Sequence, residues 1–196
     1  MLEGIKNLHF VGIGGVGMSA IAEVMLDKGY EISGSDLSES AVVKHLKAKG
    51  ATIYKGHDAL NVEGKEALVL SSAIHQDNPE LVAAKAKGLK LFHRSDILAY
   101  LLNDAKGIAV AGAHGKTTTS SMISVVLEHA KVDPTILIGG FVDYLKGNAK
   151  LGKSDYLVAE ADESDGSFLK FYPKIAVVTN IEDDHMDHYG SMENII

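Results

Sequence analysis

Two glycine-rich loops, each lying directly between an apolar strand and a helix, constrain the fold of this 196-residue chain more than any other feature. The first loop is GIGGVG at residues 12–17, and the second is GAHGKTT at residues 112–118. A strand that ends in a glycine loop and continues as a helix opens a βαβ unit, and the loop's backbone N–H groups can approach a phosphate closely. The two loops therefore predict two successive nucleotide-binding α/β units.

Short apolar runs alternate with helical stretches along the chain, a pattern typical of a parallel sheet flanked by helices. We expect strands near residues 8–12, 31–34, 52–54, 67–70, 90–92, 107–111, 135–138, 156–160 and 175–179. We expect helices near residues 17–28, 39–49, 79–87 and 95–103, and from the second loop to about residue 130. The predicted fold is α/β: a Rossmann-like parallel-sheet domain at residues 1–104, followed by the first part of a P-loop-type α/β ATP-binding domain at residues 105–196.

The composition excludes several classes of function. A net charge of −7 argues against a general role on nucleic acids or membrane surfaces, because both need a basic face. No apolar run reaches the roughly 18 residues that a membrane span requires, and the absence of cysteine excludes disulfides and thiolate catalysis. We expect a cytoplasmic protein with neither nucleic acid nor membrane as a partner, and the sequence carries no sign of its oligomeric state.

The first loop is expected to hold a phosphorylated ligand through Gly14, Gly15, Val16 and Gly17 at the start of a helix. Asp36 ends the second predicted strand, at the spacing where a carboxylate bonds a ribose hydroxyl. By chemistry alone this pattern indicates a dinucleotide and an NAD-linked dehydrogenase. A glycine turn needed only for tight helix packing is the alternative, and these residues do not decide which nucleotide binds.

The second loop is a shortened relative of the Walker A motif, with two residues between its glycines instead of four. Its backbone would cradle phosphates, while the Lys116 ammonium neutralises the terminal phosphate and the Thr117 hydroxyl ligates Mg²⁺. A chance Gly-Lys-Thr sequence at a strand end is the alternative. A dehydrogenase has no use for a second phosphate loop, so the pair favours two phosphorylated ligands. The residues expected to bind nucleotide here are Gly112, Ala113, His114, Gly115, Lys116, Thr117 and Thr118.

Carboxylates crowd the ends of the last two predicted strands. They are Glu160, Asp162, Glu163 and Asp165 after the first of these strands, and Glu182, Asp183, Asp184 and Asp187 after the second. Like charges at this density repel one another unless cations or amide dipoles offset them, so binding of a hard cation such as Mg²⁺ is a natural explanation. His185 and His188 would share one face of a helical turn, which indicates zinc as an alternative. A solvated acidic loop with surface histidines is the third interpretation, and the upstream phosphate loop favours Mg²⁺.

Six separated segments together resemble the Mur ligases, the enzymes that build the peptide stem of peptidoglycan. They are GIGGVGMSAIA, SGSDL, SSAIHQDNPE, AGAHGKTTT, VAEADESDGSF and VTNIEDDHMDHYG, in the family's order and across essentially the whole chain. The last two segments are most similar to the members that add L-alanine to UDP-N-acetylmuramate. The nearest rival in the family attaches a tripeptide to the same UDP-sugar. One departure is Ala113, where the family commonly carries threonine, and the backbone cradle should survive that change.

The resemblance implies a role for each site. In the first domain, Gly14, Gly15 and Gly17 would lie near the diphosphate of UDP-N-acetylmuramate and Asp36 near its uridine. In the second, Lys116 would stabilise charge on the transferred γ-phosphoryl group of ATP, and Thr117 and Glu160 would hold Mg²⁺. His185 would bind a second Mg²⁺, and Asn180 would help orient the ATP site.

The implied reaction converts the sugar's carboxylate to an acyl phosphate, which the amine of L-alanine then attacks. A third domain would bind the amino acid and is missing from these residues, so the chain alone is expected to catalyse no ligation. Two other functions stay open at this point: an NAD-binding oxidoreductase, and a regulatory module that senses nucleotides without ligase chemistry.

Overall fold

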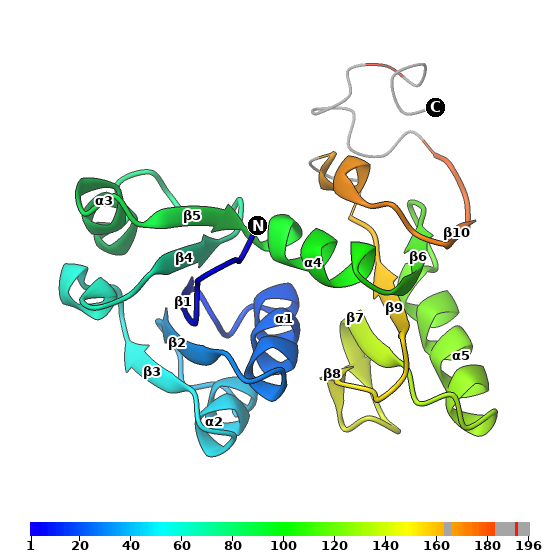
Figure 1. The fold of residues 1–196 in the computed structure, drawn as a ribbon. Coiled ribbons are helices and arrows are strands. Elements are labelled where there is room, and N and C mark those ends of the chain that lie inside the picture. Colours follow the sequence, from blue (N-terminus) through cyan, green and yellow to red (C-terminus); the bar gives the residue numbers. More distant parts are fainter. Residues whose placement is uncertain (163–165, 183–190, 192–196) are drawn as a thin grey trace. The chain divides into compact units, whose positions relative to one another are not determined.

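Strands and helices alternate through both halves of the chain in a computed structural model that describes residues 1–162, 166–182 and 191 (Figure 1). The chain divides into two compact units, Met1–Ile97 and Leu98–Ile196. The division falls within helix α4 (Arg94–Asn103). The sequence places its boundary between functional domains slightly later, at residues 104 and 105, and that boundary stays a prediction.

The first unit is built on a five-stranded parallel sheet in the order β3-β2-β1-β4-β5. Its elements are β1 (Asn7–Val11), α1 (Val16–Asp27), β2 (Glu31–Asp36), α2 (Ala41–Ala48), β3 (Thr52–Lys55), the 3-10 helix η1 (Ala59–Val62), β4 (Ala67–Leu70), α3 (Pro79–Ala86) and β5 (Lys90–His93). The chain runs outward from β1 to β3 and then returns to the other side of β1. Ligands of such sheets bind at the carboxyl ends of the strands near this reversal, which is where the first glycine loop lies.

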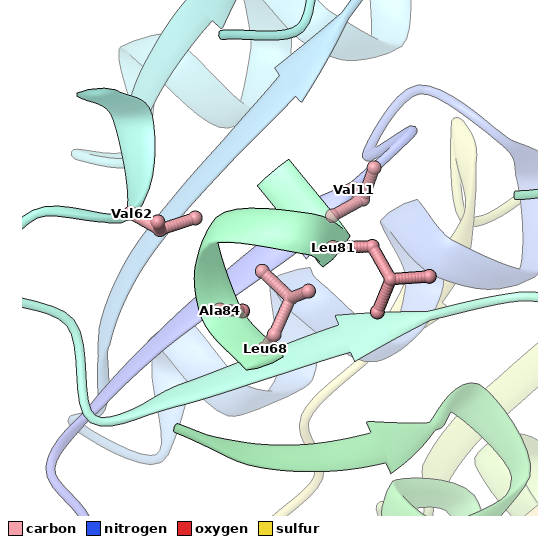
Figure 2. Packing of buried hydrophobic residues seen from close by; sticks show 5 residues of the cluster. All are labelled: Val11, Val62, Leu68, Leu81 and Ala84. Atoms are coloured by element: carbon pink, nitrogen blue, oxygen red, sulfur yellow. The ribbon is translucent and has the colours of Figure 1, made fainter. Parts of the chain in front are cut away.

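A core of aliphatic side chains joins α3 and η1 to the central strands of this sheet. Figure 2 shows its buried members Val11, Val62, Leu68, Leu81 and Ala84. Fully burying one valine or leucine side chain contributes roughly 1.5–3 kcal/mol. This cluster therefore fixes the start of α3 against the sheet.

Local capping explains where two helices of this unit begin. The Ser40 hydroxyl accepts a hydrogen bond from the Val43 N–H at 3.3 Å at the start of α2. At the start of α3, the Asn78 side-chain oxygen accepts from the Glu80 N–H at 3.0 Å. Pro79 then occupies the first turn, where its missing N–H is no loss. This cap places Glu80 at the sheet end of the helix.

The second unit has the strand order β10-β6-β9-β7-β8. Its elements after α4 are β6 (Lys106–Ala111), α5 (Lys116–His129), β7 (Thr135–Val142), β8 (Gly147–Lys150), β9 (Tyr156–Glu160), the 3-10 helix η2 (Ser167–Lys170) and β10 (Ile175–Val178). The β10, β6, β9 and β7 strands pair in parallel, and β8 pairs antiparallel with β7. Helix α5 packs against β6, β7 and β9.

The structure confirms the predicted α/β fold class, with a Rossmann-like parallel sheet followed by a second α/β unit. It adds the antiparallel hairpin of β7 and β8, which the sequence did not predict. The four residues of β8 are Gly-Asn-Ala-Lys, and none of these residue types favours strands. Within the described residues, no helix combines the length and apolar composition that crossing a bilayer requires.

Candidate functional site

The first glycine loop leaves the carboxyl end of β1 and is tied to the neighbouring strand β2. The N–H groups of Gly12 and Ile13 donate to the Ser35 carbonyl at 2.8 and 3.0 Å. The Gly14 N–H donates to Asp36 Oδ2 at 2.9 Å. The other oxygen of Asp36 accepts from the Ser38 N–H at 3.0 Å. A carboxylate oxygen accepts more than one hydrogen bond, so Asp36 braces the loop and keeps acceptor capacity at its rim.

The remaining predicted residues of this site continue into α1. Gly15 is the N-terminal cap of the helix, and Val16 and Gly17 form its first turn. The sequence did not point to Arg94, whose guanidinium Nη1 lies 3.1 Å from the position that a Cβ on Gly17 would take. A cation therefore stands beside the start of α1, where an anion would be further stabilised by the helix dipole.

The second glycine loop leaves β6 and opens α5. Gly112 has a φ of +129°, and a Cβ there would collide with the Thr179 hydroxyl and the Asn180 backbone, so only glycine fits. Lys116 is the first residue of α5, and its Nζ donates to the Gly112 carbonyl at 2.6 Å and to the Ala113 carbonyl at 3.4 Å. The ammonium thus lies over the loop that the sequence predicts to cradle phosphates.

The chain segment after β10 holds the second loop in place. β10 pairs with β6, so the residues after β10 lie beside the loop after β6. Asn180 Oδ1 accepts from the His114 N–H at 2.9 Å, and Asn180 Nδ2 donates to the His114 carbonyl, also at 2.9 Å. The Thr179 hydroxyl donates to the same carbonyl at 2.6 Å. Asn180 therefore shapes the loop through its backbone, and Thr179, which the sequence did not indicate, shares that task.

Glu160 is the last residue of β9 and lies beside the first turns of α5. The fully buried Ser120 hydroxyl is 3.2 Å from Glu160 Oε1 and 3.2 Å from the Thr117 carbonyl oxygen. Strand β7 contributes a pair of glycines here. A Cβ on Gly139 would come 2.6 Å from Glu160 Oε2, and a Cβ on Gly140 would come 3.0 Å from Thr117 Cγ2. The Glu160 carboxylate thus lies beside the first turns of α5, which carry Thr117, and the two glycines of β7 add no side chain there.

Oxygen donors of this kind suit Mg²⁺ better than zinc, because Mg²⁺ prefers carboxylate, hydroxyl and phosphate oxygens. Residues 1–162, 166–182 and 191 contain no group of three or more histidine, aspartate or glutamate side chains arranged to hold a metal. Several predicted acidic and histidine ligands lie outside the described residues, and their roles stay predictions. They are Glu163, Asp165, Asp183, Asp184, His185, Asp187 and His188.

Comparison with known proteins matches both units to families. Residues 7–117 match the Mur ligase family, catalytic domain, and residues 110–196 match the Mur ligase middle domain. A UDP-N-acetylmuramate–L-alanine ligase from Pelotomaculum thermopropionicum is 56% identical over 97% of this chain and 41% of the relative. A ligase of the same name from Dictyoglomus turgidum is 55% identical over the same shares of both chains. The chain thus spans about two fifths of the length of these curated relatives.

Solved structures show the same relationship. A UDP-N-acetylmuramate-alanine ligase from Thermotoga maritima is 34% identical with a TM-score of 0.88, over 96% of this chain and 45% of that one. The UDP-N-acetylmuramate:L-alanyl-gamma-D-glutamyl-meso-diaminopimelate ligase from Neisseria meningitides is 31% identical with a TM-score of 0.89, over 98% of this chain and 65% of that one. With a family match over more than half of its length and two glycine loops built as described, the chain belongs to the Mur ligase family.

Proposed function

We propose that this chain carries the UDP-sugar site and part of the ATP site of a cytoplasmic enzyme that joins L-alanine to UDP-N-acetylmuramate in peptidoglycan precursor synthesis. The observation that carries the proposal is the second loop, where Lys116 lies over a glycine cradle and the Glu160 carboxylate lies beside the first turns of α5, which carry Thr117. The choice of L-alanine rests on curated relatives of 53–56% identity that bear that name.

In the first unit, the diphosphate of the UDP-sugar would lie against Gly14, Gly15, Val16 and Gly17. The N-terminus of α1 and the Arg94 guanidinium both favour negative charge there. Asp36 would lie near the uridine, as the acidic residue at the end of a second Rossmann strand does. This assignment gives the first glycine loop a ligand without any redox cofactor.

In the second unit, the loop from Gly112 to Thr118 and the Lys116 ammonium would bind the phosphates of ATP. Thr117 and Glu160 would hold Mg²⁺, which neutralises charge on the phosphate oxygens. The fit rests on the donors present: Thr117 lies in the first turn of α5, and the Ser120 hydroxyl of the next turn is 3.2 Å from Glu160 Oε1, which places that carboxylate beside the start of the helix. His185 is assigned to a second Mg²⁺ on the family pattern, and it lies outside the described residues. Asn180 supports the nucleotide by holding the His114 peptide.

The reaction that this arrangement serves has two steps. The lactyl carboxylate oxygen of the sugar attacks the γ-phosphorus of ATP, and the bond to the β-phosphate oxygen breaks to release ADP. The amine of L-alanine then attacks the acyl phosphate carbon, loses a proton, and inorganic phosphate leaves. Lys116 would stabilise charge on the phosphoryl group during the first step.

An NAD-binding oxidoreductase is not favoured, because both units match Mur ligase domains and the second loop has no role in hydride transfer. A panel of thermal unfolding experiments separates these functions, since a ligand that binds the folded state raises its melting temperature. We expect UDP-N-acetylmuramate and MgATP each to stabilise the chain and NADH to have no effect. Stabilisation by NADH alone would refute the proposal.

A lysine variant tests the second site within the same panel. We expect Lys116→Ala to abolish stabilisation by MgATP and to leave stabilisation by UDP-N-acetylmuramate intact. Lys174→Ala is the matched control, because this exposed lysine precedes β10 at the opposite end of the strand from the loop. An unchanged MgATP effect in Lys116→Ala would remove Lys116 from the phosphate site.

A further inference from the structure

A buried carboxylate in the first unit has no part in the proposed chemistry. The Glu80 side chain is completely buried, and it accepts hydrogen bonds from Asn61 Nδ2 at 2.6 Å and from the Ser35 hydroxyl at 2.6 Å. His9 Nε2 lies 3.4 Å from one of its oxygens, and His57 Nδ1 lies 3.0 Å from the other. Burying a charge costs free energy unless it is fully hydrogen-bonded, so a buried carboxylate with this many partners points to a structural or functional role for the network.

Ser35 joins the network to the first glycine loop. The Ser35 carbonyl accepts from the N–H groups of Gly12 and Ile13, while its hydroxyl lies 2.9 Å from His57 Nδ1. On the adjacent strand, the Gly56 N–H donates to the Asp36 carbonyl at 2.8 Å, which extends the pairing of β3 with β2 to the residue before His57. His57 is therefore held at the same sheet edge as the loop and Asp36.

The two nitrogens of the His57 ring have different surroundings. An ionised carboxylate only accepts hydrogen bonds, so Nδ1 is the nitrogen that carries a proton toward Glu80 and Ser35. The opposite nitrogen, Nε2, has no hydrogen-bond partner in the part of the chain that the structure describes. The His57 side chain keeps 19% of its surface exposed, whereas the Glu80 side chain beneath it keeps none. The ring is anchored on one side and available on the other.

We propose that Glu80 and Ser35 hold His57 so that its Nε2 hydrogen-bonds the uridine half of the UDP-sugar. The inference rests on the proposed function of the first unit. It assigns the nucleoside half because His57 follows β3, which pairs with β2 where Asp36 ends. In sheets of this order the phosphates lie at the loop after β1, and the nucleoside extends over the end of β2.

Two substitutions at position 57 separate ligand binding from structural support. Asparagine places its amide where imidazole Nδ1 stood, so His57→Asn keeps a donor for Glu80 but has nothing at the position of Nε2. Glutamine reaches the position of Nε2, so His57→Gln keeps a group for the ligand but loses the Nδ1 hydrogen bond to Glu80. We expect His57→Asn to weaken binding of UDP-N-acetylmuramate and of UMP alike by about tenfold, the worth of one good hydrogen bond. We expect His57→Gln to bind both ligands more tightly than His57→Asn.

Binding is measured by calorimetric titration of the chain, with thermal unfolding of each variant as a check on folding. His45→Ala is the control, because His45 on α2 is an exposed histidine of the same unit whose Nε2 lies 3.0 Å from Glu23 Oε1. Wild-type affinity in His57→Asn would overturn the inference, and so would a loss seen with UDP-N-acetylmuramate but not with UMP. If the wild-type chain bound neither ligand, the proposed function of the first unit would fail with it.

Discussion

Replacing Glu80 with glutamine isolates the energy of the buried network while keeping the size of the side chain. Burial alone raises the pKa of the Glu80 carboxyl, but hydrogen bonds from His9, Ser35 and Asn61 outweigh it and lower the pKa from 4.5 to about 2. At about 1.4 kcal/mol for each factor of ten, the ionised form is stabilised by about 3 kcal/mol on folding. Glutamine has an NH₂ group in place of one carboxylate oxygen and cannot accept a hydrogen bond there, so Glu80→Gln should destabilise the first unit by about 3 kcal/mol at neutral pH.

The pH dependence gives the sign of this effect. The folded pKa lies below the unfolded one, so the stabilisation is complete above pH 4.5 and is lost as the pH falls toward about 2. The difference in unfolding free energy between the wild-type chain and Glu80→Gln should therefore shrink below pH 4.5. Urea unfolding at several pH values measures this difference, with amide hydrogen exchange of β1 and β2 reporting on the first unit alone.

Two results would refute the reasoning about Glu80. One is a Glu80→Gln variant as stable as the wild type at pH 7, which would mean that the network contributes no net energy. The other is a stability difference that does not change between pH 7 and pH 3, which would assign the loss to packing and not to the carboxylate charge. Either result would also weaken the case that Glu80 serves to anchor His57.

Two further substitutions test local features. Gly139→Ala should displace the Glu160 carboxylate, because the new Cβ would come 2.6 Å from Oε2, and the Mg²⁺ concentration needed to support ATP binding should rise about tenfold or more. A thermal-shift titration with Mg²⁺ measures this change. Gly147→Ala is the control, because its Cβ would meet nothing nearer than 3.9 Å. Ser40→Ala should lower the free energy of unfolding in urea by about 1 kcal/mol, because α2 loses its N-terminal cap. Unchanged stability would show that the cap contributes nothing to the stability of the first unit.

The sequence predicted what local chemistry determines. Both glycine loops, the strands that lead into them and the helices that follow could be located, because apolar periodicity and glycine signals act over a few residues. Helix α5 was predicted to end near residue 130, and it ends at His129. The hairpin of β7 and β8 could not be predicted, since β8 owes its strand conformation to pairing with β7 and not to its own residues.

The residues that hold each site in place could not be predicted from the sequence, for a different reason. Ser120, Thr179 and the network around Glu80 involve residues separated by 19 to 71 positions, and no local pattern links them. One signal was nevertheless visible in the sequence. The Asn-Pro-Glu segment starts α3 and places Glu80 in its first turn, and the apolar residues Leu81 and Ala84 of the same helix pack into the core. A charge carried into the core in this way requires partners from other strands. His57 is the partner that reaches the surface, which makes it the residue of this network where a buried structural requirement and ligand recognition meet.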